Sequence, residues 1–230
     1  LGKISIYDLS ADAWRETITG SPSFLIRDSD VSSDGKFLVV GADARKVKIL
    51  EWNGTNYVIK GSQIAKSELS MFGYEGLSIN GAGNVVAVSA YDASKSDSTA
   101  SEGYGAVLIF EWDESLSDWK QKGSTIWGDN LGDKLGSSGD VSLSSNGKRF
   151  AISSTLNNSG GTGAGQVKVF EWSPFNQDWK QTGLDIYGEY PGDNSGNIDL
   201  SQDGNSIVIA GSDNNGSDIA QVRVFNLPLN

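Results

Sequence analysis

Residues 166–189 read QVKVFEWSPFNQDWKQTGLDIYGE, and residues 106–129 read AVLIFEWDESLSDWKQKGSTIWGD. In both stretches an alternating segment ends in Phe-Glu-Trp, a polar turn follows, and a second segment opens with Asp-Trp-Lys-Gln. Alternation with a period of two residues on both sides of a polar turn predicts a β-hairpin. Because nearly the same hairpin sequence occurs twice, we expect the chain to be assembled from repeats.

Two kinds of hairpin alternate along the chain. Weaker copies of the first kind are present at residues 47–64 (VKILEWNGTNYVIKGSQI) and 3–18 (KISIYDLSADAWRETI), and half a copy is present at residues 222–227 (VRVFNL). In the second kind a tight glycine turn joins a short segment to an apolar one, as in residues 198–211 (IDLSQDGNSIVIAG). The turn glycines of this second hairpin are Gly35, Gly83, Gly147 and Gly204.

The two hairpins together define a unit of four strands. We name them A and B around the glycine turn, and C and D around the polar turn. Short antiparallel strands that recur in the order A-B-C-D are typical of a β-propeller blade. We therefore predict an all-β fold, a β-propeller with about four to five blade equivalents and incomplete terminal blades; a β-sandwich is the alternative. The expected single repeat domain spans residues 1–230 and divides into residues 1–20, 21–66, 67–130, 131–190 and 191–230.

Each C-D hairpin carries a pair of aromatic residues. The pairs are Trp52 with Tyr57, Trp112 with Trp119, and Trp172 with Trp179. Blades packed around an axis present equivalent surfaces, so one core residue can be reused in each of them. We expect these rings in the blade core, where burying ~150–250 Å² of one ring is worth roughly 4–6 kcal/mol at ~25 cal/mol per Å². A platform for stacking sugars is the alternative.

The composition excludes several classes of function. The chain has 230 residues, a formal net charge of −11, and 18 basic residues that are scattered rather than clustered, so nucleic acid and anionic membranes are not expected as partners. No segment approaches the ~18 apolar residues of a membrane span, so no membrane insertion is expected. The absence of Cys and His excludes thiol nucleophiles, disulfides, Ser-His-Asp catalysis and the usual zinc ligands.

Residues 135–171 carry the pattern that is most specific to a family. The segment LGSSGDVSLSSNGKRFAIS is followed by a loop rich in Gly and Ser and then by AGQVKVFEW. Phe72-Gly73 supplies a Phe-Gly pair, and Gly165-Gln166-Val167 stands where Gly-Ala-Val is usual. The arrangement resembles the FG-GAP repeats of integrin α-subunit heads and of many surface proteins of bacteria and algae. This resemblance covers almost the whole chain, and it implies a β-propeller, an extracellular or cell-surface location and a role in adhesion.

The resemblance also implies a place for calcium. FG-GAP repeats often bind the ion in the A-B turn through a loop of the form D-x-D/N-x-D/N-G-x-x-D. The ligand positions here hold Asp30, Ser32, Asp34 and Leu38 in the first copy, Asp199, Ser201, Asp203 and Ile207 in the last, and Ser78, Asn80 and Ala82 or Ser142, Ser144 and Asn146 in the middle copies. Two carboxylates without a terminal acid are too few for a tight site. We expect plain glycine turns and no cofactor, with calcium as the alternative.

Strand alternation places the A-B and C-D turns at one face of the propeller and the B-C and D-A connections at the other. These connections, at residues 89–105, 127–140, 153–165, 187–197 and 211–220, are long and rich in Gly, Ser, Asn and Asp. They are either solvated connections or an acidic rim that recognises a partner. In the second case the binding face includes Asp92, Asp97 and Glu102, and their replacement by Ala should weaken partner binding. Replacement of Asp34 and Asp203 should not.

Three Asn-x-Ser/Thr sequons occur, at Asn53, Asn157 and Asn215, and all fall in expected loops. We expect N-glycosylation at one or more of them in an extracellular protein. Asn53 is expected on the face opposite the other two.

Two classes of function remain. The first is a noncatalytic module of the extracellular space or cell surface that binds a protein or glycan, or that assembles with copies of itself. The second is a carbohydrate-active enzyme with an Asp/Glu pair across a propeller funnel. A catalytic pair needs one acid in an unusual environment, whereas Glu51, Glu111 and Glu171 stand at repeated positions, which indicates a structural role. We therefore expect the noncatalytic module, not an enzyme.

The ends contain one C strand too many, because residues 3–7 and 222–225 both have C character. If the ring closes, the last A-B-C set can recruit the strand around Trp14 as its D strand. If it does not close, two half blades present open edges that must pair with something. Because Leu1 begins inside a blade, we expect a fragment of a larger chain or a subunit of an assembly, which would be a filament if the pairing never closes.

Overall fold

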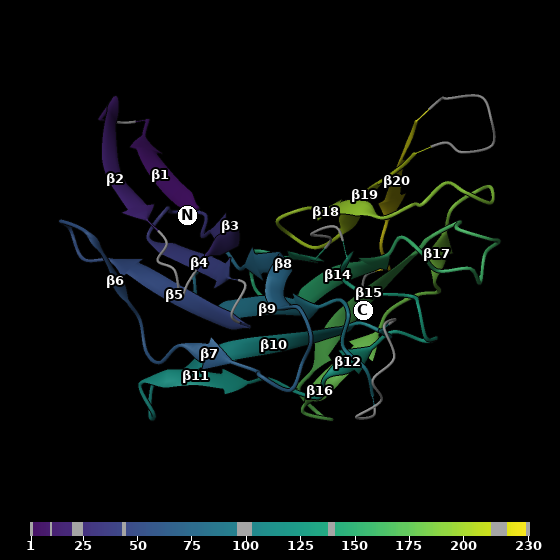
Figure 1. Ribbon diagram of the computed structural model, residues 1–230, viewed down its shortest axis with the longest axis horizontal. Coiled ribbons are helices and arrows are strands. Elements are labelled where there is room, and N and C mark those ends of the chain that lie inside the picture. The colour runs from purple at the N-terminus through teal and green to yellow at the C-terminus, as the bar shows by residue number, and fades with distance from the viewer. Residues whose placement is uncertain are drawn as a thin grey trace.

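The computed structural model describes residues 2–9, 11–19, 25–42, 45–95, 103–137, 141–212 and 220–228. In this part of the chain, twenty strands form five antiparallel sheets (Figure 1). Nowhere in the same ranges does a helix reach the length and apolarity that crossing a bilayer requires.

The sheets follow one another in chain order. The first consists of β1 (Lys3–Asp8) and β2 (Ala13–Thr19). The second consists of β3 (Ile26–Val31), β4 (Phe37–Ala42), β5 (Lys46–Trp52), β6 (Tyr57–Ile59) and β7 (Ile64–Ala65). The third consists of β8 (Phe72–Ile79), β9 (Val85–Ala90), β10 (Ala106–Asp113), β11 (Asp118–Gln121) and β12 (Ile126–Trp127). The fourth consists of β13 (Val141–Leu143), β14 (Arg149–Ser154), β15 (Gln166–Ser173), β16 (Asp178–Gln181) and β17 (Ile186–Tyr187). The fifth consists of β18 (Asn197–Leu200), β19 (Ser206–Gly211) and β20 (Gln221–Asn226).

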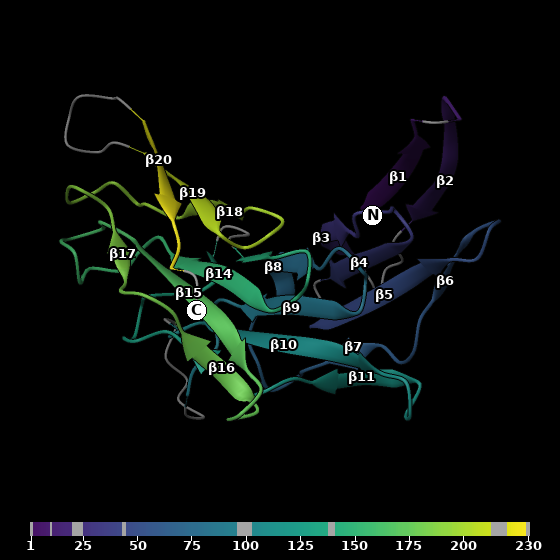
Figure 2. The ribbon, with the colours of Figure 1, turned by 180° about the vertical axis from the view of Figure 1, so that it is seen from behind.

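The second, third and fourth sheets have the predicted A-B-C-D order. In each, the C strand pairs with B on one edge and with D on the other, and a short continuation of D (β7, β12 or β17) returns to pair with C. The A strands β3, β8, β13 and β18 contact one another in succession, so they surround a common axis. Figures 1 and 2 show the sheets arranged as an arc of blades. This confirms the all-β propeller fold.

The two terminal sheets are incomplete blades. β1 and β2 form a C-D hairpin, and β18 to β20 form an A-B-C set. In Figure 1 the purple hairpin and the yellow sheet stand at the two ends of the arc. β2 pairs with β1, and within the described ranges β20 pairs with β19 alone. The pairing of β20 with β2, the strand around Trp14, which a closed ring would require, is therefore not formed in the described residues.

Apolar clusters fill the four junctions between successive sheets, which we number first to fourth in chain order. β10 illustrates the arrangement, because Leu108 and Phe110 pack toward the second sheet, whereas Val107 and Ile109 pack toward the fourth. A strand that is covered on both faces needs apolar residues at successive positions. This explains why the C strands of the middle sheets interrupt their alternation with continuous runs such as AVLIF.

The predicted aromatic pairs lie in these junctions. Ring centroids are 5.1 Å apart for Trp52 and Tyr57, and 5.3 Å apart for Trp172 and Trp179. Trp179 is only 8% exposed and also meets Phe150 edge-on at 5.0 Å. The rings therefore contribute to the cores between blades, as expected from their repetition.

The A-B turns require their glycines. Gly83 has a φ of +70°, and a Cβ there would lie 2.0 Å from the ring of Phe37 in the preceding sheet. Neighbouring turns are also joined directly, since Gly81 donates its N–H to the carbonyl of Ser145, and Ser145 donates to that of Gln202. The turns therefore gather at one end of the axis, where only glycine allows both the backbone conformation and the close approach.

Candidate binding site

The long connections are held together by backbone hydrogen bonds. Gly132 donates to the carbonyl of Gly103 at 3.0 Å, and Leu135 donates to that of Tyr104 at 3.0 Å, which joins a B-C connection to the D-A connection that follows it. Asp92 takes part in this contact, because its carboxylate accepts the N–H of Gly103 at 3.2 Å and lies 3.8 Å from the ammonium of Lys134. Asp92 is half-buried and ties loops together. The other two acids of the expected binding face, Asp97 and Glu102, lie outside the described residues.

The sequons differ in accessibility. Asn53 is exposed in the turn between β5 and β6. Asn157 is completely buried, and its Nδ2, the atom that would carry a glycan, donates to the side chain of Gln166 at 3.3 Å. The folded chain therefore offers no access to Asn157, which argues against glycosylation there. Asn215 lies outside the described residues.

The acids of the A-B turns accept hydrogen bonds from within the same turn. Ser32 donates its hydroxyl to Asp34 at 2.7 Å, and the same carboxylate accepts the N–H of Lys36 at 2.9 Å. Asp203 makes the matching contacts, with Ser201 at 2.6 Å and with the N–H of Asn205 at 3.0 Å. The serine hydroxyls, followed by these backbone donors, lower the pKa of both acids. Among the residues that the structure describes, no group of three or more acids forms a metal-binding cluster.

Asp28 and Asp30 form a pair of acids on the inner strand β3; the calcium-loop pattern includes Asp30, and no motif of the sequence includes Asp28. Asp28 accepts the N–H groups of Ser29 at 2.7 Å and Leu77 at 3.0 Å. Asp30 accepts those of Val31 at 2.7 Å and Ile79 at 2.8 Å. Burial raises the pKa of Asp28. Because each of the four carboxylate oxygens accepts a backbone N–H, the pair joins β3 to β8 and is not arranged for proton transfer to a substrate.

The contact made by Asp30 is repeated around the axis. Ser78 accepts the N–H of Leu143 at 3.1 Å, and Ser142 accepts that of Leu200 at 3.0 Å. In each case a polar side chain on one A strand binds the backbone of the next A strand. We call this series the inner ladder. The side chains differ between rungs, and β3 (IRDSDV) is itself largely polar, so no sequence signal marks the ladder.

The D strands carry a second repeated contact at the outer rim. Trp119 donates its indole N–H to the carbonyl of Lys60 at 2.9 Å, and Trp179 donates to that of Lys122 at 2.8 Å. The preceding acid, Asp118 or Asp178, accepts a backbone N–H of the previous sheet at 2.7 Å. These backbone donors are the main reason that the pKa values of both acids are lowered.

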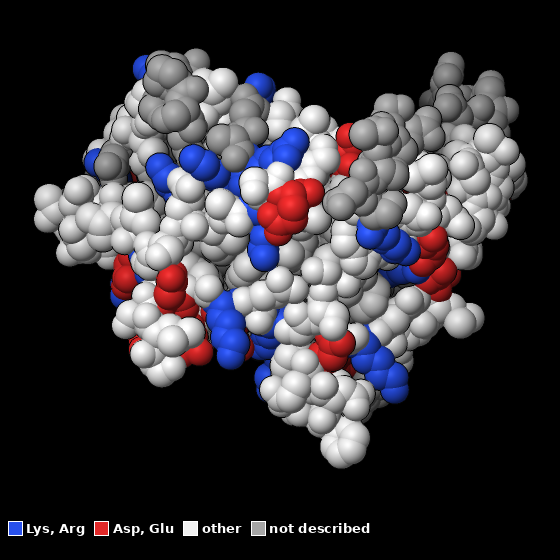
Figure 3. Space-filling model, turned by 60° about the horizontal axis from the view of Figure 1, so that its bottom comes forward, with Lys and Arg blue, Asp and Glu red and all other residues white. Residues whose placement is uncertain are grey.

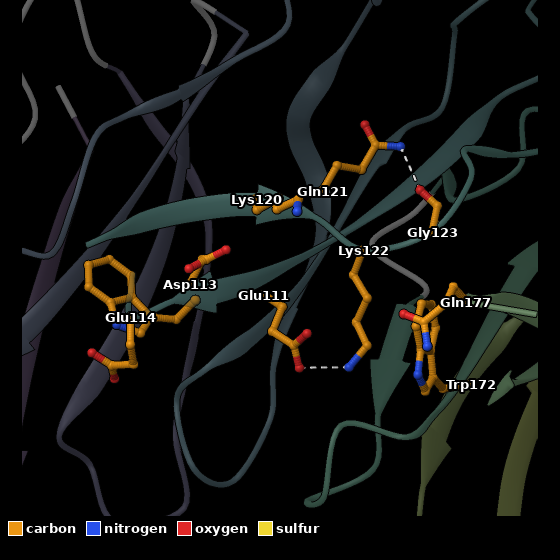
Figure 4. Close-up of a pocket in the computed structure, with 10 residues that line it drawn as sticks. Glu111, Asp113, Glu114, Lys120, Gln121, Lys122, Gly123, Trp172 and Gln177 are labelled. Atoms are coloured by element: carbon orange, nitrogen blue, oxygen red, sulfur yellow. Dashed lines mark hydrogen bonds and ion pairs between the residues drawn. The ribbon is translucent and has the colours of Figure 1, made fainter. Parts of the chain in front are cut away.

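A groove of about 480 Å³ lies at the rim of the third junction. Figure 4 shows Lys122 between Glu111 and Trp172, with a Lys122–Glu111 distance of 2.7 Å. Lys122 also lies 4.8 Å from the centroid of the Trp172 ring. The exposed side chains of Glu114 and Gln177 line the two ends. The groove therefore combines an aromatic wall with exposed hydrogen-bonding groups.

Trp112 carries a buried donor on the opposite face of the third sheet. Its indole nitrogen is buried and has no hydrogen-bond partner within the described ranges. The ring lies 4.6 Å from the ammonium of Lys60 and 5.5 Å from the ring of Trp119, which places it at the second junction. The aromatic wall of the groove at the third junction is therefore the ring of Trp172.

Related grooves occur at two other junctions. One of about 420 Å³ lies at the fourth junction, with Glu171, Trp172 and Lys180 in its lining. Another, of about 410 Å³, lies at the first junction beside Tyr7 and Arg15. The molecule therefore presents a row of grooves along one rim.

Ion pairs bring together charges of both signs in the molecule. Lys168 lies 2.7 Å from Asp129, and Arg149 lies 3.1 Å from Glu171. Burial would raise the pKa of Asp129, but its hydrogen bonds with Lys168 and Gln166 outweigh burial and lower it. Figure 3 shows Lys and Arg interspersed with Asp and Glu on the face turned toward the viewer. The surface seen there has no continuous patch of one sign.

These features define a β-propeller with a grooved rim. Similar solved structures include the complex of KlAtg21 with the coiled-coil of AgAtg16 (15% identical, covering 99% of this chain and 59% of that chain, TM-score 0.67). The hydrazine synthase of Kuenenia stuttgartiensis is 13% identical, and the match covers 96% of this chain and 55% of that chain with a TM-score of 0.57. The tricorn protease is 13% identical, and the match covers 96% of this chain and 23% of that chain with a TM-score of 0.54. At these identities the likeness shows the fold alone, and the chain spans less than two thirds of each of these structures. No family model, that of FG-GAP repeats included, and no curated protein matches the chain.

Proposed function

We propose that this protein is a noncatalytic β-propeller module of the cell surface or extracellular space, which binds a protein or glycan through its rim grooves. The observation that carries the proposal is the groove at the third junction, where the ring of Trp172 and the exposed side chains of Glu114 and Gln177 line one concave surface. A sugar or a peptide side chain can pack on the ring while its polar groups bond to these side chains.

Three further observations support a binding role. Aromatic residues and exposed polar groups in one concave surface are typical of recognition sites. The acids with the most perturbed surroundings, such as Asp28, accept backbone N–H groups and so serve the fold. One of the similar propellers is itself seen in complex with a coiled-coil. The resemblance to FG-GAP repeats supports the location and an adhesive role.

The experiment compares two indoles. Labelled protein is applied to a printed glycan array and to immobilised fibronectin, laminin and collagen. Trp172→Phe keeps an aromatic ring but removes part of the wall of the groove, so binding should fall roughly tenfold. Trp112→Phe is the matched control, because it makes the same change in a ring that lies at the second junction. It should leave binding unchanged.

Equal binding of the wild type and Trp172→Phe to every probe would contradict the proposed site. Release of free sugar from a bound glycan would contradict the noncatalytic role. Loss of binding in Asp92→Ala, with Trp172→Phe unaffected, would move the site to the long connections.

A further inference from the structure

β20 has the composition of a central strand but lies at an edge. The equivalent strands β5, β10 and β15 are each paired on both sides, whereas β20 pairs within the described residues only with β19. Edge strands are usually protected by charged residues or proline. Val222 and Val224 of β20 are 66% and 70% exposed, because no described sheet packs on the face that carries them, whereas their counterparts on β15, Val167 and Val169, pack against the fifth sheet.

The backbone of β20 is oriented for a further partner. Leu227 donates its N–H to Asn205 on the β19 side. Because successive N–H groups of a strand point to opposite edges, that of Asn226 points to the open edge. On β15 the same edge receives β16, with Trp172 opposite Trp179, Glu171 opposite Lys180 and Phe170 opposite Gln181. The corresponding positions on β20 are Leu227, Asn226 and Phe225.

The rim of the fourth junction, next to β20, has the features that hold a D strand at the third junction. At the third junction, Asp178 of β16 accepts the N–H of Ser124 at 2.7 Å, and Trp179 packs against the third sheet. Leu184 holds the position of Ser124 in the fourth sheet, and its side chain is 90% exposed. The groove of about 420 Å³ at the fourth junction, next to Pro228, lies beside the place where the matching Asp-Trp pair would insert.

We propose that the open edge of β20 is a docking site for one antiparallel strand that carries an Asp-Trp pair. The tryptophan lies opposite Leu227, the next residue lies opposite Asn226 and pairs through the backbone, and the aspartate accepts the N–H of Leu184. The occupant is an extended segment with the chemistry of this repeat, and it completes the fifth sheet as β16 completes the fourth. This surface is distinct from the groove of the proposed function at the third junction.

The test uses the chain's own D strand as a probe. A fluorescein-labelled peptide FNQDWKQTGLDIY, the sequence of residues 175–187, is titrated into the intact protein and followed by anisotropy. We expect saturable binding with one peptide per protein, and slower amide exchange along β20. Replacing the peptide's tryptophan by Ala should weaken binding at least tenfold. A peptide of scrambled sequence should not bind.

Two further variants test the backbone pairing. Thr182 donates its N–H to Val169 across the β15–β16 pair, so the N–H of Lys180, two residues earlier, points the same way. N-methylation of the peptide at this lysine should abolish binding without any change to the protein. Asn226→Pro removes the outward N–H of β20 and should have the same effect in a protein whose unfolding curve is unchanged.

Several outcomes would overturn the proposal. They are absence of binding, equal binding of the scrambled or N-methylated peptide, and strong exchange protection of the outward N–H of Asn226 in the protein without peptide. Concentration-dependent dimers that the peptide does not dissociate would assign the edge to a second copy of the chain instead.

Discussion

The third and fourth junctions follow one plan but are closed by different groups. In the third, Trp179 packs on Phe150, and Lys122 lies between Glu111 and the ring of Trp172. In the fourth, Thr182 replaces Lys122, and a buried arginine crosses the junction instead. Arg149 donates to the carbonyls of Gly204 at 3.0 Å and Pro228 at 2.9 Å, while it also binds Glu171.

The difference shows that two kinds of side chain can close the same kind of junction. An aromatic D strand closes a junction mainly by burial of apolar surface, which needs no exact partner. A buried guanidinium needs several acceptors in fixed positions. The fourth junction should therefore respond more sharply to a single polar change, and the third to a change in volume.

The largest effect is expected from Phe150→Ala. Phe150 is fully buried, stacks on Phe170 at 5.1 Å and meets Trp179. Its truncation should cost ~3–5 kcal/mol in urea unfolding. Ile207→Ala, at the same position of the fifth sheet, should cost less because it leaves no large ring unsupported. A larger loss for Ile207→Ala would break the comparison.

The next effect is expected from Arg149→Met, which keeps much of the side chain's volume but removes its hydrogen bonds. Breaking a buried, hydrogen-bonded ion pair costs ~3 kcal/mol or more. The loss should be local, so amide exchange in β18 to β20 should accelerate on the order of 100-fold while β8 to β11 stay protected. Uniform acceleration over all five sheets would show that Arg149 supports the whole molecule rather than the fourth junction.

A smaller effect is expected from Lys122→Met. Lys122 contributes one ion pair near the surface and one contact with an aromatic ring, which together are worth about 1 kcal/mol. A double-mutant cycle with Glu111→Gln separates the two, because the ring contact remains when the carboxylate is neutralised. If Lys122→Met costs as much as Arg149→Met, the two junctions do not differ in the way described.

The smallest effect concerns pH. The pKa of Asp178 is lowered in the folded chain, chiefly by the backbone N–H of Ser124. Its contribution to stability is therefore complete above the unfolded pKa of about 3.9, and it is lost as pH falls through the lower folded pKa. Asp178→Asn should lose less stability than the wild type between about pH 4 and pH 2. Parallel curves of unfolding free energy against pH would contradict this.

The strands and turns could be predicted because their signals are local. Alternation marked the C strands, and glycine marked the A-B turns, where Gly35 and Gly204 adopt φ values of +68° and +74°. Repetition then gave the order of strands in each sheet. The aromatic pairs could also be placed in the core, since a residue that recurs in every unit has to fit the same junction.

The contacts between sheets could not be predicted in the same way. Each rung of the inner ladder is a side chain that accepts a backbone N–H of the next A strand. The rungs use an aspartate at Asp30 but serines at Ser78 and Ser142, so no motif marks the inner ladder. Asn157 shows a second limit: a sequon is a local pattern, whereas its burial depends on the packing of Gln166 and the surrounding connections. The unpaired indole N–H of Trp112 could not be predicted either, because the sequence around Trp112 matches that around Trp172.

The inner ladder has a consequence for how the molecule bears load. Each rung, such as that from Ser142 to Leu200, joins only two neighbouring sheets. A force applied between the chain ends therefore passes through the junctions one after another, and the weakest yields first. In single-molecule pulling, such a chain releases its sheets as separate events rather than in one rupture, because each interface contributes its own term to stability.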